Sequence, residues 1–108
     1  MATHELTNEA ERSNEVVHRD TETKGVFMIR RDSHRVAEMT YSKAGETMII
    51  IDHTEIDESL RGTGAGLQLL TAAADWARAN SKQVMATCPF AIATFRKHPE
   101  LRDVYVGA

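Results

Sequence analysis

Three glycines alternate in the segment from Leu60 to Leu67, which reads LRGTGAGL. Glycine exposes backbone N–H groups and lets a ligand approach without interference from a Cβ atom. The segment follows an apolar run and precedes residues with helical periodicity, so it is predicted to open a helix. The N–H groups and the dipole at a helix N-terminus attract anions. We therefore predict a phosphate-binding loop here, and its composition suits a pyrophosphate.

Other phosphate-binding loops fit this segment less well. A dinucleotide-binding fold needs Gly-x-Gly-x-x-Gly after its first strand, but here the third glycine comes one residue early. A nucleotide-hydrolase loop ends in Gly-Lys-Ser or Gly-Lys-Thr, and this segment contains no lysine. A glycine-rich turn without a ligand is the remaining alternative. It is disfavoured because glycines that open a helix are costly unless something approaches them.

Three side chains outside the loop have the chemistry for proton transfer or nucleophilic attack. Glu55 either accepts a proton or is an outward-facing strand carboxylate, and both interpretations stay open. His53 shares a face with Glu55 if the strand is regular. It is interpreted as a base, as a positioning group or as a hydrogen-bonded strand histidine. Cys88 precedes a predicted helix, where a thiol becomes more nucleophilic; the alternative is an ordinary core cysteine.

The pattern of apolar residues predicts the elements that hold these side chains. Strand candidates come first, and the last of them is apolar throughout and therefore central. They cover 16–17, 25–31, 34–43 and 47–51, with a hairpin at 43–46. Helical spacing of apolar residues then predicts a helix from Leu67 to Ala77, which Asn80 ends. A strand at 83–88, a helix at 90–97 stopped by Pro99 and a last strand at 101–106 complete the prediction.

The order of these elements predicts the fold class. A helix between neighbouring strands of one sheet makes those strands parallel, by a right-handed crossover. We therefore expect an α+β fold of mixed α/β type, in which an antiparallel meander is followed by a strand–helix–strand unit. The length of 108 residues predicts one domain at 16–108, after a mobile tail at 1–15 that has almost nothing to bury.

Composition excludes several classes of function. Lys and Arg number 13 against 16 Asp and Glu, and this net charge of −3 argues against a strongly basic nucleic-acid binder or membrane-surface binder. The single cysteine excludes a disulfide framework and a multi-cysteine zinc site, and no metal site is predicted. No stretch approaches the ~18 apolar residues of a membrane span, and the N-terminus lacks a signal-peptide core. A cytoplasmic protein is expected.

Several motifs resemble a known superfamily. Arg61-x-x-Gly64-x-Gly66 resembles the acetyl-CoA loop Arg/Gln-x-x-Gly-x-Gly/Ala of the GNAT N-acetyltransferases, in the same setting between a central strand and a helix. Two further stretches resemble a small GNAT-like subfamily. They are His53-Thr54-Glu55-Ile56 before the loop, and Cys88-Pro89-Phe90 followed by His98-Pro99-Glu100 after the helix. The resemblance covers about residues 16–106.

This resemblance implies a GNAT fold, in which the strands on either side of the long helix splay apart and acetyl-CoA lies in the cleft between them. The pantetheine arm is then expected along Thr54 to Asp57, and the pyrophosphate on the N–H groups of the glycine loop. The cofactor-binding residues implied in this way are Thr54, Ile56, Arg61, Gly62, Thr63, Gly64, Ala65 and Gly66.

Two departures from larger GNAT enzymes concern the acceptor. Larger members have two helices between their first two strands, but only a short segment separates Val17 from Gly25, so the acceptor side is expected to be open. Larger members also often use a tyrosine as general acid where this chain has Phe95. The function implied is direct acetyl transfer to an unidentified amine, with Cys88 lining the cleft. The alternative is a CoA-binding module without efficient catalysis, acting in interaction or regulation.

Overall fold

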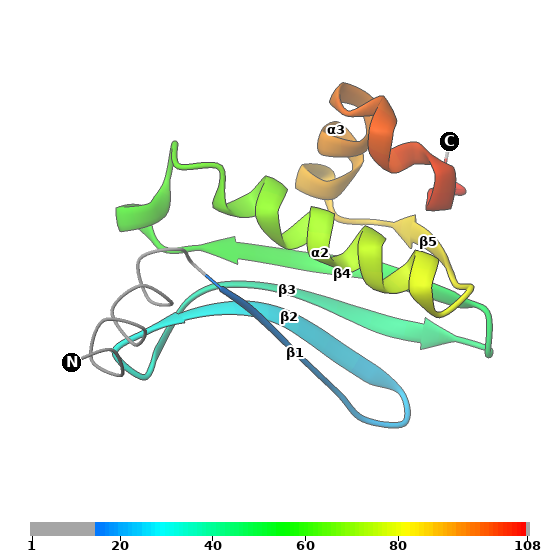
Figure 1. Ribbon diagram of the computed structural model, residues 1–108, viewed down its shortest axis with the longest axis horizontal. Coiled ribbons are helices and arrows are strands. Elements are labelled where there is room, and N and C mark those ends of the chain that lie inside the picture. Colours follow the sequence, from blue (N-terminus) through cyan, green and yellow to red (C-terminus); the bar gives the residue numbers. More distant parts are fainter. Residues whose placement is uncertain (1–14, 108) are drawn as a thin grey trace.

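A five-stranded sheet in the order β1-β2-β3-β4-β5 organises residues 15–107, the part of the chain that the computed structural model describes (Figure 1). The first four strands form an antiparallel meander, and β5 pairs parallel with β4, which confirms the mixed α/β class. The predicted tail lies outside the described residues, except for Glu15. The strands are β1 (Val16–Asp20), β2 (Lys24–Arg31), β3 (His34–Ala44), β4 (Met48–Ile56) and β5 (Gln83–Ala86).

Short turns join the strands of the meander. Asp32 and Ser33 have φ values of 51° and 70° and form the tight connection between β2 and β3. Gly45, with φ of 75°, lies in the predicted hairpin between β3 and β4. Residues 21–23 alone connect β1 with β2, so no helix stands between the first two strands. This confirms the expectation that the helices of larger GNAT enzymes are missing at this point.

Two α-helices and two 3-10 helices follow the meander. They are η1 (Glu58–Leu60), α2 (Ala65–Ala79), α3 (Pro89–Lys97) and η2 (Pro99–Val104). The helix α2 begins before the predicted Leu67, and Asn80 ends it as predicted. None of the described helices has the length and apolar composition needed to cross a membrane.

The predicted last strand at 101–106 is wrong. Pro99 begins the 3-10 helix η2 instead, because proline fits the first turn of a helix and lacks the N–H that a strand would use. A strand-like contact survives only after it: Tyr105 forms an isolated parallel bridge with Val84, and the Val106 N–H donates to the Val84 carbonyl at 2.8 Å.

The core lies between α2 and one face of the sheet. Alternate residues of β3, namely Ala37, Met39 and Tyr41, are buried against it as their period-2 spacing predicts. The helix contributes a buried stripe that includes Leu69, Leu70, Ala73, Ala74 and Ala77. Figure 1 shows α2 running along this face, while no helix of residues 15–107 covers the opposite face of β1–β4. The sheet therefore has one packed face and one open face.

An aromatic cluster closes the packed face at β1. The ring of His18 stacks on Phe27 with centroids 4.1 Å apart, and Trp76 of α2 meets it edge-on at 5.0 Å. His18 Nε2 lies 2.7 Å from the Tyr41 hydroxyl, in a hydrogen bond. Burial lowers the pKa of His18 and raises the pKa of Tyr41 to about 12, so both groups favour their neutral forms.

Candidate active site

The glycine loop adopts the backbone that its sequence predicts. Gly62 and Gly64 have φ values of 80° and 86°, in the left-handed region that glycine occupies without strain. Gly64 is the N-cap of α2, and no side chain caps this helix end. The first N–H groups of a helix have no partner within the helix. The amides that follow Gly64 are therefore donors for a ligand, and the helix dipole favours an anion there.

The open space in front of the loop is large enough for a ligand to approach. A Cβ atom built on Gly62 or Gly64 would meet no heavy atom within 4 Å. Gly66 is different, because a Cβ there would lie 2.2 Å from Phe90 Cζ and 3.0 Å from Ile56 Cδ1. Gly66 thus lets the Phe90 ring close over the start of α2. The loop fits the pyrophosphate group that its sequence predicts.

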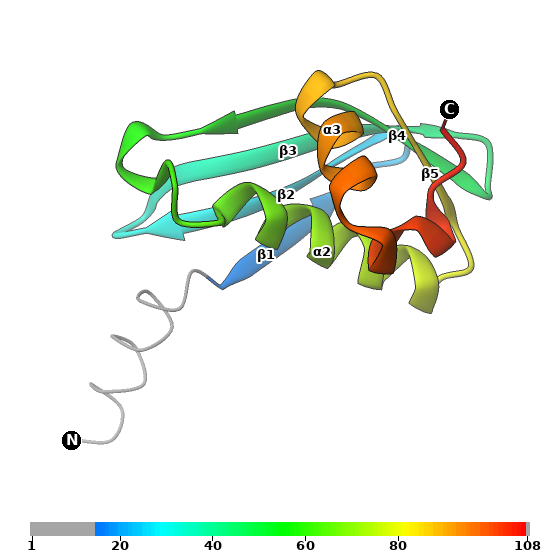
Figure 2. The same cartoon turned by 90° about the horizontal axis from the view of Figure 1, so that it is seen from above.

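The sheet opens between β4 and β5 beside this loop (Figure 2). The two strands pair from Met48 and Gln83 to Ile51 and Ala86, but β4 continues to Ile56. The last shared hydrogen bonds run from the N–H groups of Thr87 and Cys88 to the Ile51 carbonyl, at 2.9 and 3.3 Å. Beyond this break, one edge of β4 has no neighbouring strand. An extended ligand can bond to that backbone as another strand would.

A cavity of about 360 Å³ joins the free edge of β4 to the glycine loop. Seven of the eight predicted cofactor-binding residues line it, and Thr63 does not; its hydroxyl donates to the Leu60 carbonyl at 2.5 Å instead. Phe90, which is 39% exposed, forms the wall on the side of α3. The lining is Thr54, Ile56, Leu60, Arg61, Gly62, Gly64, Ala65, Gly66, Leu67 and Phe90. We call this cavity the loop cleft.

Cys88 lies against Thr54, one of the lining residues of the loop cleft. Its side chain is buried, with 5% exposure, and its Sγ donates to Thr54 Oγ1 at 3.3 Å. It is the N-cap of α3, and its side chain makes no capping hydrogen bond. The predicted cysteine is therefore next to one predicted cofactor-binding residue, at the point where β4 and β5 part.

The other two predicted catalytic residues lie on the open face of the sheet. Glu55 pairs across the strands with Glu38, and His53 with Thr40, whereas Thr54 pairs with the buried Met39. His53 Nε2 is 3.6 Å from Glu55 Oε1, which confirms that they share a face, and their side chains are 58% and 73% exposed. His53 and Glu55 therefore lie on the opposite face of β4 from Thr54, the residue that Cys88 contacts.

Glu38, His53 and Glu55 also form a cluster of possible metal ligands. One ligand atom from each lies within 4.8 Å of the others. Arg35 Nη1 already donates to Glu38 Oε1 at 2.6 Å, so the guanidinium of Arg35 is the positive partner of one of these carboxylates.

Asp52 is a site residue that the sequence reasoning missed. Thr40 pairs with His53 and Tyr41 with Ile51, so Asp52 is the extra residue of a β-bulge. Its Oδ1 accepts from the Thr40 hydroxyl at 2.7 Å and its Oδ2 from the Ser42 hydroxyl at 3.0 Å. A signal existed, because Asp52 is the first charge after the apolar run, but the bulge that turns it to the open face is not visible in the sequence.

Phe95 occupies the position where larger GNAT enzymes often have a tyrosine as general acid. Phe95 is fully buried and stacks on Tyr105 with centroids 4.1 Å apart. Of the two tyrosines in the chain, neither lines the loop cleft. The loop cleft is therefore equipped to hold an anionic, extended ligand. Arg61 is the one ionisable side chain among its lining residues, and the thiol of Cys88 contacts the lining residue Thr54.

Comparisons with known proteins agree with this geometry. A family model described as GCN5-related N-acetyl-transferase matches residues 26–104. A GCN5-like protein from Staphylococcus aureus is 34% identical, with a TM-score of 0.68 over 88% of this chain and 90% of that chain. A comparison with curated proteins found no match.

More distant structures share the fold. A ribosomal-protein-alanine N-acetyltransferase from Brucella melitensis biovar Abortus 2308 is 17% identical, with a TM-score of 0.61 over 71% of this chain and 62% of that chain. An aminoglycoside N-acetyltransferase in complex with CoA is also 17% identical, with a TM-score of 0.51 over 76% and 60%. The family model covers most of the chain, and so does the Staphylococcus aureus structure. The chain therefore belongs to the GCN5-related N-acetyltransferase family.

Proposed function

We propose that this protein is an N-acetyltransferase that takes its acetyl group from acetyl-CoA and passes it to an amine. The single observation that carries the proposal is the loop cleft, which joins a glycine loop at a helix N-terminus to an unpaired strand edge. These are the two surfaces that a pyrophosphate and an extended pantetheine arm require. The printed complex of a distant relative with CoA supports this choice of cofactor.

The residues divide the work along the cleft. The amides after Gly62 and Gly64 hold the pyrophosphate, and Arg61 adds a positive charge beside them. The free edge of β4 from Thr54 to Ile56 holds the arm. Acetyl-CoA supplies the activated acyl group as a thioester. Thr54 and Cys88 then line the break between β4 and β5, where the acyl group is expected, and Cys88 acts as a wall residue.

The reaction converts an ammonium group and a thioester into an amide, a thiol and one proton. The amine must first lose a proton to be nucleophilic. The carboxylates available for this step near the break are those of Asp52 and Glu55, both on the open face. We propose direct transfer, in which the acceptor approaches from that face and one of these groups accepts its proton.

A CoA-binding module without efficient catalysis is the second candidate. Two observations favour it: no tyrosine lines the loop cleft, and the Glu55 side chain is largely exposed. The cleft serves both functions equally well, so cofactor binding alone does not separate them.

Calorimetric titration with CoA and acetyl-CoA tests the binding step, and thiol release in the presence of an amine panel tests turnover. We expect binding of both ligands, loss of binding in Gly64→Val, and thiol release that depends on the amine. Binding without thiol release from any amine identifies the binding module. Absence of binding at millimolar CoA contradicts both candidates.

A further inference from the structure

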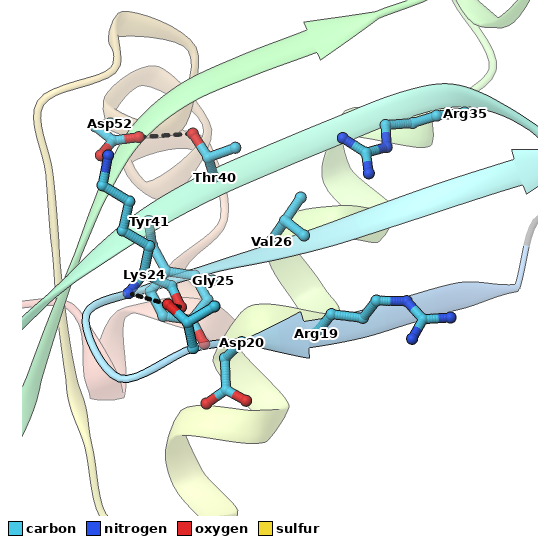
Figure 3. Close-up of a pocket in the computed structure, with 10 residues that line it drawn as sticks. Arg19, Asp20, Lys24, Gly25, Val26, Arg35, Thr40, Tyr41 and Asp52 are labelled. Carbon is cyan, nitrogen blue, oxygen red and sulfur yellow. Dashed lines mark hydrogen bonds between the residues drawn. The ribbon is translucent and has the colours of Figure 1, made fainter.

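A hollow on the open face of the sheet lies behind the loop cleft. It has a volume of about 420 Å³, and side chains from β1, β2, β3 and β4 line it (Figure 3). It exists because no helix of the described chain covers this face. Two of its lining residues are Lys24, at the start of β2, and Asp52, in the bulge of β4. The first is an amine and the second a carboxylate, which are the two groups that a transfer to nitrogen requires.

Ser42 brings Lys24 and Asp52 together. Lys24 is the cross-strand partner of Ser42, and neighbouring strands are about 4.8 Å apart. The Ser42 hydroxyl donates to Asp52 at 3.0 Å. Figure 3 shows the Lys24 side chain extending from β2 toward Asp52. The long lysine side chain therefore lies on the same face as Asp52 and extends across β3 toward the bulge.

Lys24 differs from two of the other lysines in its partners. Lys43 Nζ donates to Asp20 at 2.8 Å and to the Thr21 carbonyl at 2.6 Å, and Lys82 Nζ donates to the Glu46 carbonyl. Lys24 forms no salt bridge with any residue from 15 to 107. Its amine can therefore move within the hollow without breaking an ion pair.

Asp52 stands at the break in the sheet. It directly follows Ile51, the last residue of β4 that pairs with β5, and Thr54 of the loop cleft follows two residues later. From Asp52 onward no strand closes the sheet on that side of β4. The hollow and the loop cleft therefore meet β4 two residues apart, at Asp52 and at Thr54.

We propose that Lys24 is an acetyl acceptor within its own chain. Asp52 accepts one proton from the Lys24 ammonium, the nitrogen attacks the thioester carbonyl carbon, the carbon–sulfur bond breaks, and the second proton of the nitrogen passes to the departing thiolate. The products are N-acetyl-Lys24, CoA thiol and the proton that Asp52 returns to solvent. The acetyl group removes the charge in front of Asp52 and fills part of the hollow, so the modification closes the site to other amines. This inference rests on the proposed function.

The test compares the lysines of the full chain, Lys24, Lys43, Lys82 and Lys97, as internal references for one another. Acetyl occupancy of each is followed by peptide mass spectrometry with acetyl-CoA, and separately with N-acetoxysuccinimide, a donor that does not use the loop cleft. We expect the rate at Lys24 relative to Lys97 to be at least about tenfold higher with acetyl-CoA than with the reagent, the lower part of the range for a positioned base. The rate is expected to be independent of protein concentration.

Variants distinguish transfer assisted by Asp52 from acetylation of Lys24 that results only from its exposure to solvent. Asp52→Asn is expected to lower the acetyl-CoA rate at Lys24 about tenfold or more while CoA affinity is retained. Asp20→Asn, which removes another carboxylate of the same hollow, is the matched control and leaves that rate unchanged. Gly64→Val removes the preference for Lys24 but keeps reactivity with the reagent.

The outcomes distinguish this inference from the proposed function. If both donors give the same ratio of acetylation among the four lysines, while CoA binds and added amines are acetylated, Lys24 is not an acceptor and the proposed function stands. If CoA does not bind, both are overturned. An unchanged rate in Asp52→Asn would overturn the role of Asp52 in the transfer.

Discussion

Cys88 and Glu55 represent two routes for acetyl transfer, and they lie on different sides of β4. The thiol contacts Thr54, which lines the loop cleft, whereas the carboxylate is on the open face. A relay through Cys88 would need a base next to the thiol, and no acidic or histidine side chain lines the loop cleft. We therefore expect direct transfer, with the thiol as part of the cleft wall.

The variant Cys88→Ser tests this expectation. It keeps a small side chain that can hydrogen-bond to Thr54, so we expect most of the turnover and the CoA affinity to remain. Incubation of the wild type with acetyl-CoA should leave no hydroxylamine-sensitive acetyl group on Cys88. A thioester on Cys88 that passes its acetyl group to an amine at a competent rate would contradict direct transfer.

Glu55→Gln is the companion measurement on the open face. If Glu55 is the base, its loss lowers thiol release about a hundredfold. Both side chains are exposed, but two hydroxyls hold the Asp52 carboxylate in place, so we expect the larger loss in Asp52→Asn. A greater loss in Glu55→Gln than in Asp52→Asn would restore the role that the sequence predicted for Glu55.

At the residue scale, the sequence predicted the cofactor side better than the acceptor side. Gly62, Gly64 and Gly66 carry a local signal, since their backbone requirement is set by neighbours in the chain. Asp52 depends on a bulge formed with β3, and such a register shift is set by pairing between strands. The side chains of His53 and Glu55 were correctly placed on one face, but the sequence does not say which face is open.

At the scale of elements, the junction of the glycine loop with α2 and α3 decides how tightly the cleft closes. Gly64 and Gly66 belong to the same loop but face different constraints, one of backbone and one of space. This difference provides a matched pair of variants.

Gly64→Ala and Gly66→Ala are expected to respond differently when Phe90→Ala is added to each of them. In Gly66→Ala the new Cβ displaces the Phe90 ring, so we expect the CoA affinity to fall. The double variant Gly66→Ala/Phe90→Ala is expected to bind CoA no more weakly than Gly66→Ala alone. Gly64→Ala strains a φ of 86°, and Phe90→Ala gives no relief. Calorimetry with CoA and circular dichroism measure affinity and folding. Equal effects of Phe90→Ala in both backgrounds would show that the ring does not press on residue 66.

Most elements were predicted, although β1 and β4 are longer than predicted and η1 was not expected; the one element assigned to the wrong type has a local cause. The strands of the meander and the helix α2 follow from clear periods in the apolar pattern. The segment after α3 has apolar residues at Leu101 and Val104, a spacing that both a strand and a 3-10 helix can accommodate. Pro99 favours the 3-10 helix, because it begins that helix. The cytoplasmic location and the absence of nucleic-acid or membrane partners stay predictions, as does the unidentified amine.

At the scale of the whole molecule, cofactor binding couples to stability, because the loop cleft joins β4, α2 and α3. A ligand present at 100 times its dissociation constant stabilises the folded state by roughly 2.7 kcal/mol. For a domain of this size the melting temperature rises by about 4–8 °C per kcal/mol, so we expect an increase of roughly 10–20 °C. Thermal unfolding with and without CoA measures the shift. The same experiment on Gly64→Val is the control, in which the shift is expected to vanish.

The buried pair of His18 and Tyr41 makes stability depend on pH. Burial holds the pKa of His18 below its ordinary value of 6.5, so the unfolded chain binds the proton more readily. The stabilisation is therefore complete above pH 6.5 and is lost as the pH falls through the folded-state pKa. We expect the melting temperature of the wild type to decrease between pH 7 and pH 5.

The variant His18→Gln removes this titration. It is less stable at pH 7, since the stacking on Phe27 is lost, but its melting temperature should fall less between pH 7 and pH 5. The carboxylates with lowered pKa, Asp20, Asp57 and Asp103, lose their contribution only below about pH 3.8 and do not interfere. An equally steep decrease in the variant would assign the acid sensitivity to another group.

The bridge between Val84 and Tyr105 has a consequence for the behaviour of the protein in concentrated solution. An outer strand with unpaired N–H and C=O groups is a template for another chain, which leads to aggregation. The Val106 N–H donates to the Val84 carbonyl, and so the end of the chain occupies part of that template on β5. The same short segment that failed to become a strand thus covers the outer edge of β5 at Val84, and this position is not available to a strand of a second molecule.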